Sequence, residues 1–122
     1  MDYTNRAYWQ AMMNASLCRL LILRIICERP RHGYGIIGRA AELTKHQCVP
    51  TEGTVYPVLR DLEKAGCVRC RIEKTGRRER KVYGATARGR QALRAGADVW
   101  RAGLARLQIL MGPAPDRQVH DT

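Results

Sequence analysis

Half of the basic residues in this chain lie in one short stretch. Of the 22 Lys and Arg residues among 122, 11 fall between Arg60 and Arg90. Clustered Lys and Arg side chains neutralise phosphates, which supply much of the affinity of proteins for nucleic acids. The densest group surrounds a glycine turn and forms a basic finger that suits a minor groove. Its members are Lys74, Arg77, Arg78, Arg80 and Lys81. The competing interpretation is a hairpin whose charge only keeps the protein soluble.

A second group of polar residues follows Thr51. Apolar residues at positions 55, 58, 59, 62 and 65 have a helical period, so the opposite helix face is polar. On that face Thr54 can bond a base edge or phosphate, and on its flanks Tyr56 can bond a phosphate and Arg60 a guanine by two hydrogen bonds. Thr51 leaves the helix N-terminus able to receive a phosphate. The candidate DNA contacts outside the finger are Tyr34, Thr51, Thr54, Tyr56, Arg60 and Lys64. The alternatives are a solvated helix face and a half-buried core role for Tyr56.

The cysteines invite a metal interpretation. Cys67 and Cys70, together with His46 and Cys48, supply the four ligands of a tetrahedral site. The helix between the two pairs would span about 22 Å, and two cysteines three apart on a strand point to opposite faces. We therefore expect structural thiols with no metal and no cofactor, and keep a thiol- or metal-responsive sensor as an alternative.

Composition excludes several classes of protein. The formal charge is +11 with 45% apolar residues, which indicates a folded domain with an anionic partner. We find no phosphate-binding glycine loop and no catalytic triad, so we expect a protein that is not an enzyme. Arg19 and Arg24 interrupt the only long apolar segment, so we expect no membrane partner and a cytoplasmic location.

These residues must be positioned by four helices and a hairpin. The apolar period predicts helices over 4–27, 34–43 and 51–65, with a bend or a late start caused by Pro57. Two alternating segments, 67–73 and 79–84, flank a polar turn at 74–78 and predict a β-hairpin. Thr86 caps a last helix that ends at Gly112. The expected fold is mainly α with a small β-hairpin, a winged helix-turn-helix plus a long C-terminal dimerisation helix. We expect a DNA-binding domain over 1–85, the dimerisation helix over 86–112 and a disordered tail over 113–122.

The last predicted helix carries a heptad stripe. Leu93, Trp100 and Leu107 are seven residues apart, and such a stripe needs a partner helix, which favours a homodimer. The expected dimer contacts are Leu17, Leu20, Leu93, Trp100, Leu104, Leu107 and Met111. Trp100 is either a core anchor of the dimer or one of two rings that sandwich a small planar apolar effector. The residues that would line such a pocket are Met12, Met13, Ser16, Ala97 and Trp100.

Several segments resemble the PadR family of bacterial transcriptional regulators. The matching motifs are His-Gly-Tyr-Gly-Ile at 32–36, Gly-Thr-Val-Tyr-Pro-Val-Leu at 53–59, Leu-Glu at 62–63, Gly66, residues 77–83 and Thr-Ala-Arg-Gly at 86–89. The resemblance covers roughly 15–95, although Cys67 and Ala85 stand where the family usually has leucines. It implies a dimeric DNA-binding repressor, similar to the compact subgroup in which one C-terminal helix builds the dimer and some members bind planar drugs.

The resulting prediction is a sequence-specific DNA-binding transcriptional regulator. We expect a homodimeric repressor on double-stranded DNA, bound at a pseudo-palindromic operator and released by a small ligand. A different class of protein uses the same charge without sequence selection, as a non-specific nucleoid or RNA-binding protein does. The ratio of specific to non-specific affinity at a stated salt concentration separates the two.

Overall fold

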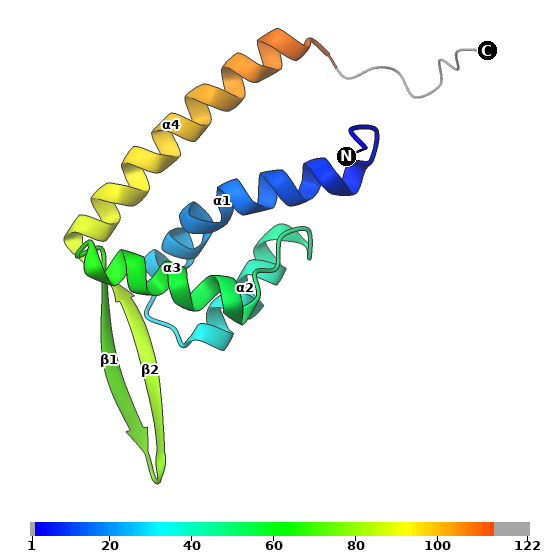
Figure 1. Cartoon of the computed structure of the whole chain (residues 1–122). Helices are drawn as coiled ribbons and strands as arrows, with labels where there is room; N and C mark the ends of the chain where they lie inside the picture. The colour runs from blue at the N-terminus through cyan, green and yellow to red at the C-terminus, as the bar shows by residue number, and fades with distance from the viewer. Residues whose placement is uncertain (1, 114–122) are drawn as a thin grey trace.

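The computed structural model describes residues 2–113 and contains four helices and one hairpin in that range. The elements are α1 (Arg6–Glu28), α2 (Gly33–Thr44), α3 (Glu52–Lys64), β1 (Val68–Thr75), β2 (Arg78–Ala85) and α4 (Ala87–Met111). Helices α1, α2 and α3 lie together, the hairpin extends from them in one direction and α4 in another (Figure 1). The predicted mainly α fold with a winged helix-turn-helix is confirmed. Apart from Pro113, the tail expected at 113–122 lies outside the described residues.

The core forms around the C-terminal half of α1. Cys18, Ile22, Leu23, Ile25 and Ile26 are buried there and pack against apolar residues of α2, α3 and the hairpin. By length and composition alone, α1 is long and apolar enough to cross a membrane, so its two arginines do not exclude such a segment as the sequence suggested. Core helices pass the same test, and burial of the C-terminal half accounts for the apolar residues there.

Helix α3 runs without interruption through Pro57. The helix begins at Glu52, so the late start considered above is wrong. Val55, Val58 and Leu59 are buried, and Pro57 lies on the exposed face. Pro57 has no backbone N–H to donate to the preceding helical turn. Because Pro57 lies on the exposed face, solvent can reach the turn that lacks this hydrogen bond.

The hairpin is longer than the sequence predicted, and its turn is shorter. Thr75 pairs directly with Arg78, so the turn consists of Gly76 and Arg77 instead of five residues. Gly76 has a φ of 64°, at the position where a type II′ turn takes glycine. Both strands were predicted too short because both faces near the tip are solvent-exposed, so no burial pattern in the sequence marks the strand ends.

Alternation along the two strands divides the basic finger between two faces. The inner face packs on the helices through Val68, Cys70, Tyr83 and Ala85, and it also carries Ile72, Lys74, Glu79 and Lys81. The outer face points away from the helical core. It carries Arg69, Arg71, Glu73, Thr75, Arg78, Arg80, Val82 and Gly84.

A short, pinned connection joins the hairpin to α4. The Thr86 hydroxyl donates to the Gly66 carbonyl oxygen at 2.6 Å and accepts from the Gly89 N–H at 3.1 Å, which confirms the predicted cap. Gly89 is buried against the carbonyl oxygen of Cys67, in a space that no side chain can enter. Further along, α4 packs on α1, where a Cβ atom at Gly96 would lie 2.8 Å from Cδ1 of Leu20, so a larger residue there would require the Leu20 side chain to shift.

Candidate nucleic-acid interface

The exposed face of α3 carries four of the predicted DNA contacts. Thr54, Arg60 and Lys64 are exposed along the helix, and Thr51 precedes its first turn. The hydroxyls of Thr51 and Thr54 lie 3.3 Å apart, and Thr51 makes no side-chain capping bond to the backbone. The first N–H groups of α3 are therefore left to bind an anion, as a DNA phosphate would require.

Acidic residues on the same helix are placed so that they oppose little of this charge. The Asp61 carboxylate accepts a hydrogen bond from the Arg19 guanidinium of α1 at 2.9 Å, and both side chains are exposed. Glu52, in the first turn of α3, raises the pKa of the exposed Tyr34 through a hydrogen bond and through its negative charge. Sequence reasoning missed Arg19 as the partner of Asp61, because the two residues are 42 positions apart.

A hollow of about 500 Å³ lies between the start of α2 and β2. Four predicted DNA contacts line it, namely Tyr34, Tyr56, Arg80 and Lys81. The ring of Tyr56 lies against Gly33 and is half-buried, so Tyr56 is part of the core as well as of this surface. His32 makes no side-chain cap on α2, and its buried Nε2 has no partner among the described residues. The hollow is also lined by Glu79, whose carboxylate pairs with Lys74 at 3.6 Å. The N-terminus of α2, two basic residues and two tyrosines together suit a phosphate.

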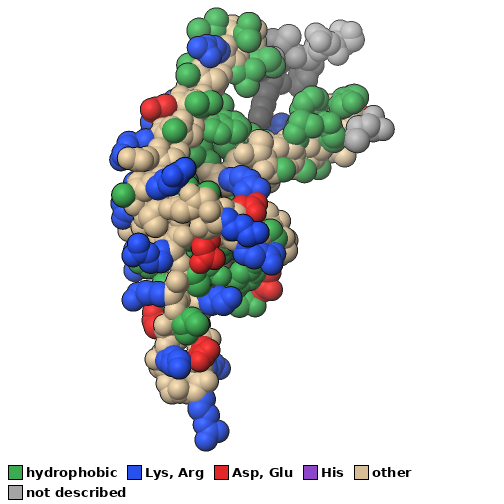
Figure 2. All heavy atoms as spheres, turned by 60° about the vertical axis from the view of Figure 1, so that its left-hand side comes forward, with side chains coloured by type: hydrophobic (Ala, Val, Ile, Leu, Met, Phe, Trp, Pro, Cys, Tyr) green, Lys and Arg blue, Asp and Glu red, His purple; other side chains and the backbone are tan. Residues whose placement is uncertain are grey.

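The tip of the hairpin carries two arginines without an acidic partner in the described range. Lys and Arg side chains extend along the hairpin to its very end (Figure 2). Lys74 pairs with Glu79 at 3.6 Å, whereas Arg77 and Arg78 have no acidic partner within 4.0 Å in the described part of the chain. The structure therefore places Arg77 and Arg78 at the tip, Arg80 and Lys81 nearer the helices, and Lys74 in an ion pair.

The four residues considered for a metal do not come together. Cys67 is buried before β1 begins, Cys70 lies opposite Tyr83 on the inner face, and Cys48 is buried beside α1. No group of three His, Cys, Asp or Glu residues within 2–113 is placed to hold a metal ion. Burial raises the pKa of the Cys18, Cys27 and Cys48 thiols. A raised pKa disfavours the reactive thiolate, so these three cysteines have the character of structural residues.

The predicted dimer contacts fall into two groups. Leu17, Leu20, Leu93 and Trp100 are half-buried within the chain itself, and Leu93 packs on the core. Leu104, Leu107 and Met111 are 52%, 50% and 74% exposed. Of the predicted ligand-lining residues, Met12 and Met13 are 48% exposed, Ser16 is exposed, and Ala97 and Trp100 are half-buried. Met13 lines a small surface hollow with three other residues of α1, whereas a pocket between two chains stays a prediction.

These features define a class of protein: a helical domain whose third helix has a free polar face, followed by a basic hairpin, is a winged helix-turn-helix DNA-binding protein. The model of the transcriptional regulator PadR-like family matches residues 22–95. The chain therefore belongs to the PadR-like family of transcriptional regulators, and DNA-binding regulation is the function of its class.

Individual relatives agree with this assignment. A PadR family regulator from Eggerthella lenta has 23% identity and a TM-score of 0.77, with 88% of this chain and 93% of that chain covered. A protein from Streptococcus mutans UA159 has 29% identity and a TM-score of 0.64, with coverages of 82% and 92%. The transcriptional regulator YqjI of Escherichia coli is 33% identical over 61 residues, which are 50% of this chain. The chain matches only 30% of the length of YqjI.

Proposed function

We propose that this protein is a sequence-specific, homodimeric repressor of transcription that acts in the cytoplasm. One observation carries the proposal: the exposed face of α3 and the uncompensated arginines of the hairpin tip flank a hollow that suits a phosphate. Helix α3 enters the major groove, where Thr54 and Arg60 contact base edges and Lys64 contacts the backbone. The hairpin tip enters the adjacent minor groove.

The hollow between α2 and β2 sets the register of the protein on DNA. A backbone phosphate bound there contacts the hydroxyls of Tyr34 and Tyr56 and the cations of Arg80 and Lys81. These groups come from three different elements, α2, α3 and β2. Such a phosphate contact carries no sequence information, but it fixes where the bases lie relative to α3.

Dimerisation through α4 is supported by apolar residues that this chain leaves uncovered. Val99, Ile109 and Leu110 are more than 70% exposed, and the heptad residues Leu104 and Leu107 lie among them. A partner helix that covers this surface removes it from water, which is the main driving force for association. Two copies related by a twofold axis present two α3 helices, which matches a pseudo-palindromic operator.

The release step rests on Trp100. A small planar apolar ligand that stacks between the Trp100 rings of the two chains would change the spacing of the two α3 helices. Release then requires that the ligand binds one dimer arrangement more tightly than the other. Quenching of tryptophan fluorescence by planar cationic dyes tests this step. We expect quenching to be lost in Trp100→Ala with dimerisation unchanged in sedimentation. Quenching that persists through Trp9 would leave Trp100 as a packing residue only.

The DNA immediately upstream of the gene for this protein is the first place to seek an operator, since many repressors control their neighbours. Nuclease protection of this DNA should give one footprint with dyad symmetry, bound at least about a thousandfold more tightly than random duplex at a fixed salt concentration. A uniform affinity for all sequences would support the non-specific nucleoid alternative instead.

A further inference from the structure

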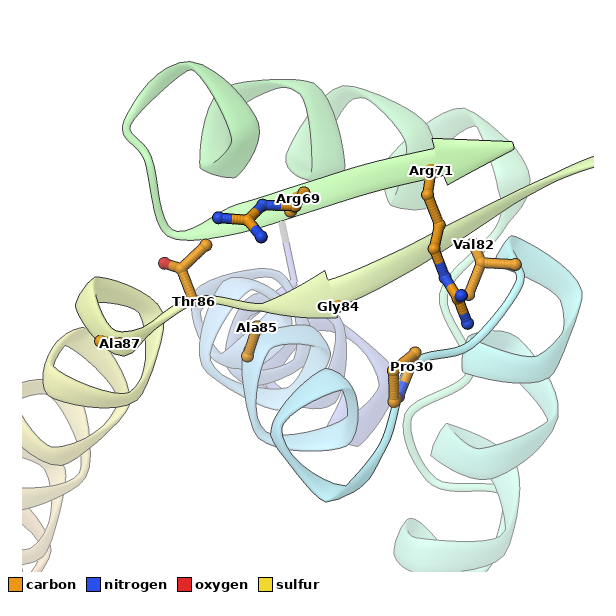
Figure 3. A pocket seen from close by; sticks show the side chains of 8 residues that line it. All are labelled: Pro30, Arg69, Arg71, Val82, Gly84, Ala85, Thr86 and Ala87. Atoms are coloured by element: carbon orange, nitrogen blue, oxygen red, sulfur yellow. The ribbon is translucent and has the colours of Figure 1, made fainter. Parts of the chain in front are cut away.

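The outer face of the hairpin contains a groove that the proposed DNA contacts do not use. The cavity has a volume of about 410 Å³ and lies where β1, β2, the loop before α2 and the start of α4 meet. Arg69 and Arg71 extend from β1 over this region (Figure 3). The Arg69 side chain points toward Thr86, and the Arg71 guanidinium lies beside Val82 and points toward Pro30.

Arg69 and Arg71 lie away from the DNA surface that we propose for α3 and the hairpin tip. They lie on the face that points away from the helical core. Arg69 is six residues from Thr75 at the end of β1, which is about 20 Å along the strand. The cations at the tip can therefore lie in a minor groove without bringing Arg69 to the same phosphates.

The positive charge of the groove is largely uncompensated. Arg69 has no acidic partner within 4.0 Å among residues 2–113, and Arg71 has one long contact of 4.0 Å with Glu73. The Cα atoms of Arg69 and Arg71 are about 6.7 Å apart along the strand. Their side chains point to opposite ends of the groove (Figure 3), so binding of one anion by both requires the two long side chains to turn toward each other. Two guanidinium groups match the charge of a phosphate monoester, which is about −1.5 to −2 at pH 7, better than that of a carboxylate.

The floor of the groove is apolar and held in place. Arg31 and Tyr83 exchange two backbone hydrogen bonds of 3.0 and 2.9 Å, which hold the neighbouring Pro30 beside β2. Pro30 Cγ would lie 3.5 Å from a Cβ atom at position 84, so the glycine there keeps the floor open. Val82 completes this floor, and Ala85 also lines the groove although its side chain packs toward the core. A flat apolar group fits against it while its charged end reaches the arginines.

We propose that this groove binds a small phosphate monoester with a flat apolar body. Arg69 and Arg71 bind the phosphate, and the body lies on Pro30, Val82, Gly84 and Ala85. The site is separate from the Trp100 pocket and from the face of α3, so it does not depend on either. Because the ligand contacts both the loop before α2 and the residues before α4, its binding joins the DNA-reading half of the chain to the dimerisation helix.

Site-resolved NMR titration of the full chain with 1-naphthyl phosphate tests the proposal. We expect saturable shifts of the Gly84, Ala85, Thr86 and Ala87 amides in the wild type. In Arg69→Gln/Arg71→Gln, binding should weaken by at least about tenfold, which corresponds to about 1.4 kcal/mol, because both charged partners of the phosphate are lost. Glutamine keeps part of each methylene stem over the groove, and unchanged amide shifts elsewhere would show that the variant is folded.

A matched variant removes the same charge from the same face. Arg78→Gln/Arg80→Gln lies outside the groove, and it should bind 1-naphthyl phosphate as the wild type does. Equal weakening in both double variants would reduce the effect to general charge and overturn the site. No saturable shift in the wild type would overturn it too.

Three further ligands separate the parts of the proposal. Inorganic phosphate should bind more weakly than 1-naphthyl phosphate, because it lacks the apolar body, and 1-naphthoate should bind more weakly because it carries one charge. Equal affinity for 1-naphthyl phosphate, inorganic phosphate and 1-naphthoate would overturn the proposed ligand class. A short random duplex should leave the four amides unshifted. If the duplex displaces 1-naphthyl phosphate and the DNA affinity of Arg69→Gln/Arg71→Gln depends less on salt, the phosphate is that of DNA and the small-ligand proposal is wrong.

Discussion

Removal of the two uncompensated arginines at the hairpin tip should change the salt dependence of DNA binding by a defined amount. Arg77 and Arg78 are both exposed, and neither has an acidic partner in the described part of the chain. Each phosphate contact that is lost lowers the slope of log K against log salt by about 0.9. Arg77→Ala/Arg78→Ala should therefore lower the slope by about 1.8 for one chain, or about 3.6 if a dimer places both hairpins on one operator.

Loss of Lys74 should lower the slope of log K against log salt by a smaller amount. Its ammonium group lies 3.6 Å from the Glu79 carboxylate, so part of its charge is already neutralised without DNA. Lys74→Ala should lower the slope by less than about 0.9. Fluorescence anisotropy with a labelled operator and with a scrambled duplex of equal length, from about 50 to 300 mM KCl, measures both slopes.

The double variant should weaken binding to both duplexes, because backbone contacts carry no sequence information. Its free energy of unfolding should hardly change, since Arg77 and Arg78 are exposed. Arg69→Gln/Arg71→Gln is the control, with the same loss of charge at the other end of the hairpin, and its slope should equal that of the wild type. A wild-type slope in Arg77→Ala/Arg78→Ala, or an equal drop in both variants, would refute the placement of the tip on DNA.

Four further substitutions test other parts of the structure. Thr54→Ala and Arg60→Ala should each cost about 1 to 3 kcal/mol on operator DNA and less on random duplex, measured by anisotropy, and equal losses on both would mean that they contact only the backbone. Gly89→Ala should lower the free energy of unfolding in urea by about 2 kcal/mol, because the added methyl meets a backbone carbonyl, and a stabilised variant would contradict this packing. Glu28→Gln should cost about 1 to 2 kcal/mol at pH 7. Arg39 and Arg24 hold the pKa of Glu28 far below its ordinary 4.5, so the stability that it contributes is present above that pH and is lost on acidification. Urea unfolding of Glu28→Gln at a series of pH values should show a shallower loss below about pH 4.5 than the wild type.

Local patterns in the sequence were sufficient for the element order. The apolar period located all four helices, and the Thr86 cap could be predicted because a threonine before a helical period bonds backbone within three residues. The exposed face of α3 followed from the same period, since Val55, Val58 and Leu59 define the buried side. These features depend on neighbours in the chain, and such neighbours are visible in a sequence.

Features that depend on register or on distant contacts could not be predicted. The basic finger is divided between two faces because Thr75 pairs with Arg78. The sequence does not reveal this register, since no residue near the tip is buried. The ion pair between Arg19 and Asp61 and the contact of Gly89 with Cys67 join elements that only the fold brings together. The groove beneath Arg69 was missed for the same reason, because its lining comes from four separate segments.

The contacts around α1 and Thr86 link α4 to α3, the helices that we propose for dimerisation and for DNA reading. Thr86 alone separates β2 from α4, and its hydroxyl bonds both the residue that ends the α3 turn and the first turn of α4. On the other side, α4 packs closely on α1 at Leu20, and α1 is joined to α3 by Arg19 and Asp61. With a pinned connection at one end and a packed contact at the other, α4 cannot swing freely against α3. In the proposed homodimer, a ligand that changes the angle between the two α4 helices would therefore move the two α3 helices with them, and the spacing of the α3 helices on the proposed operator would change accordingly.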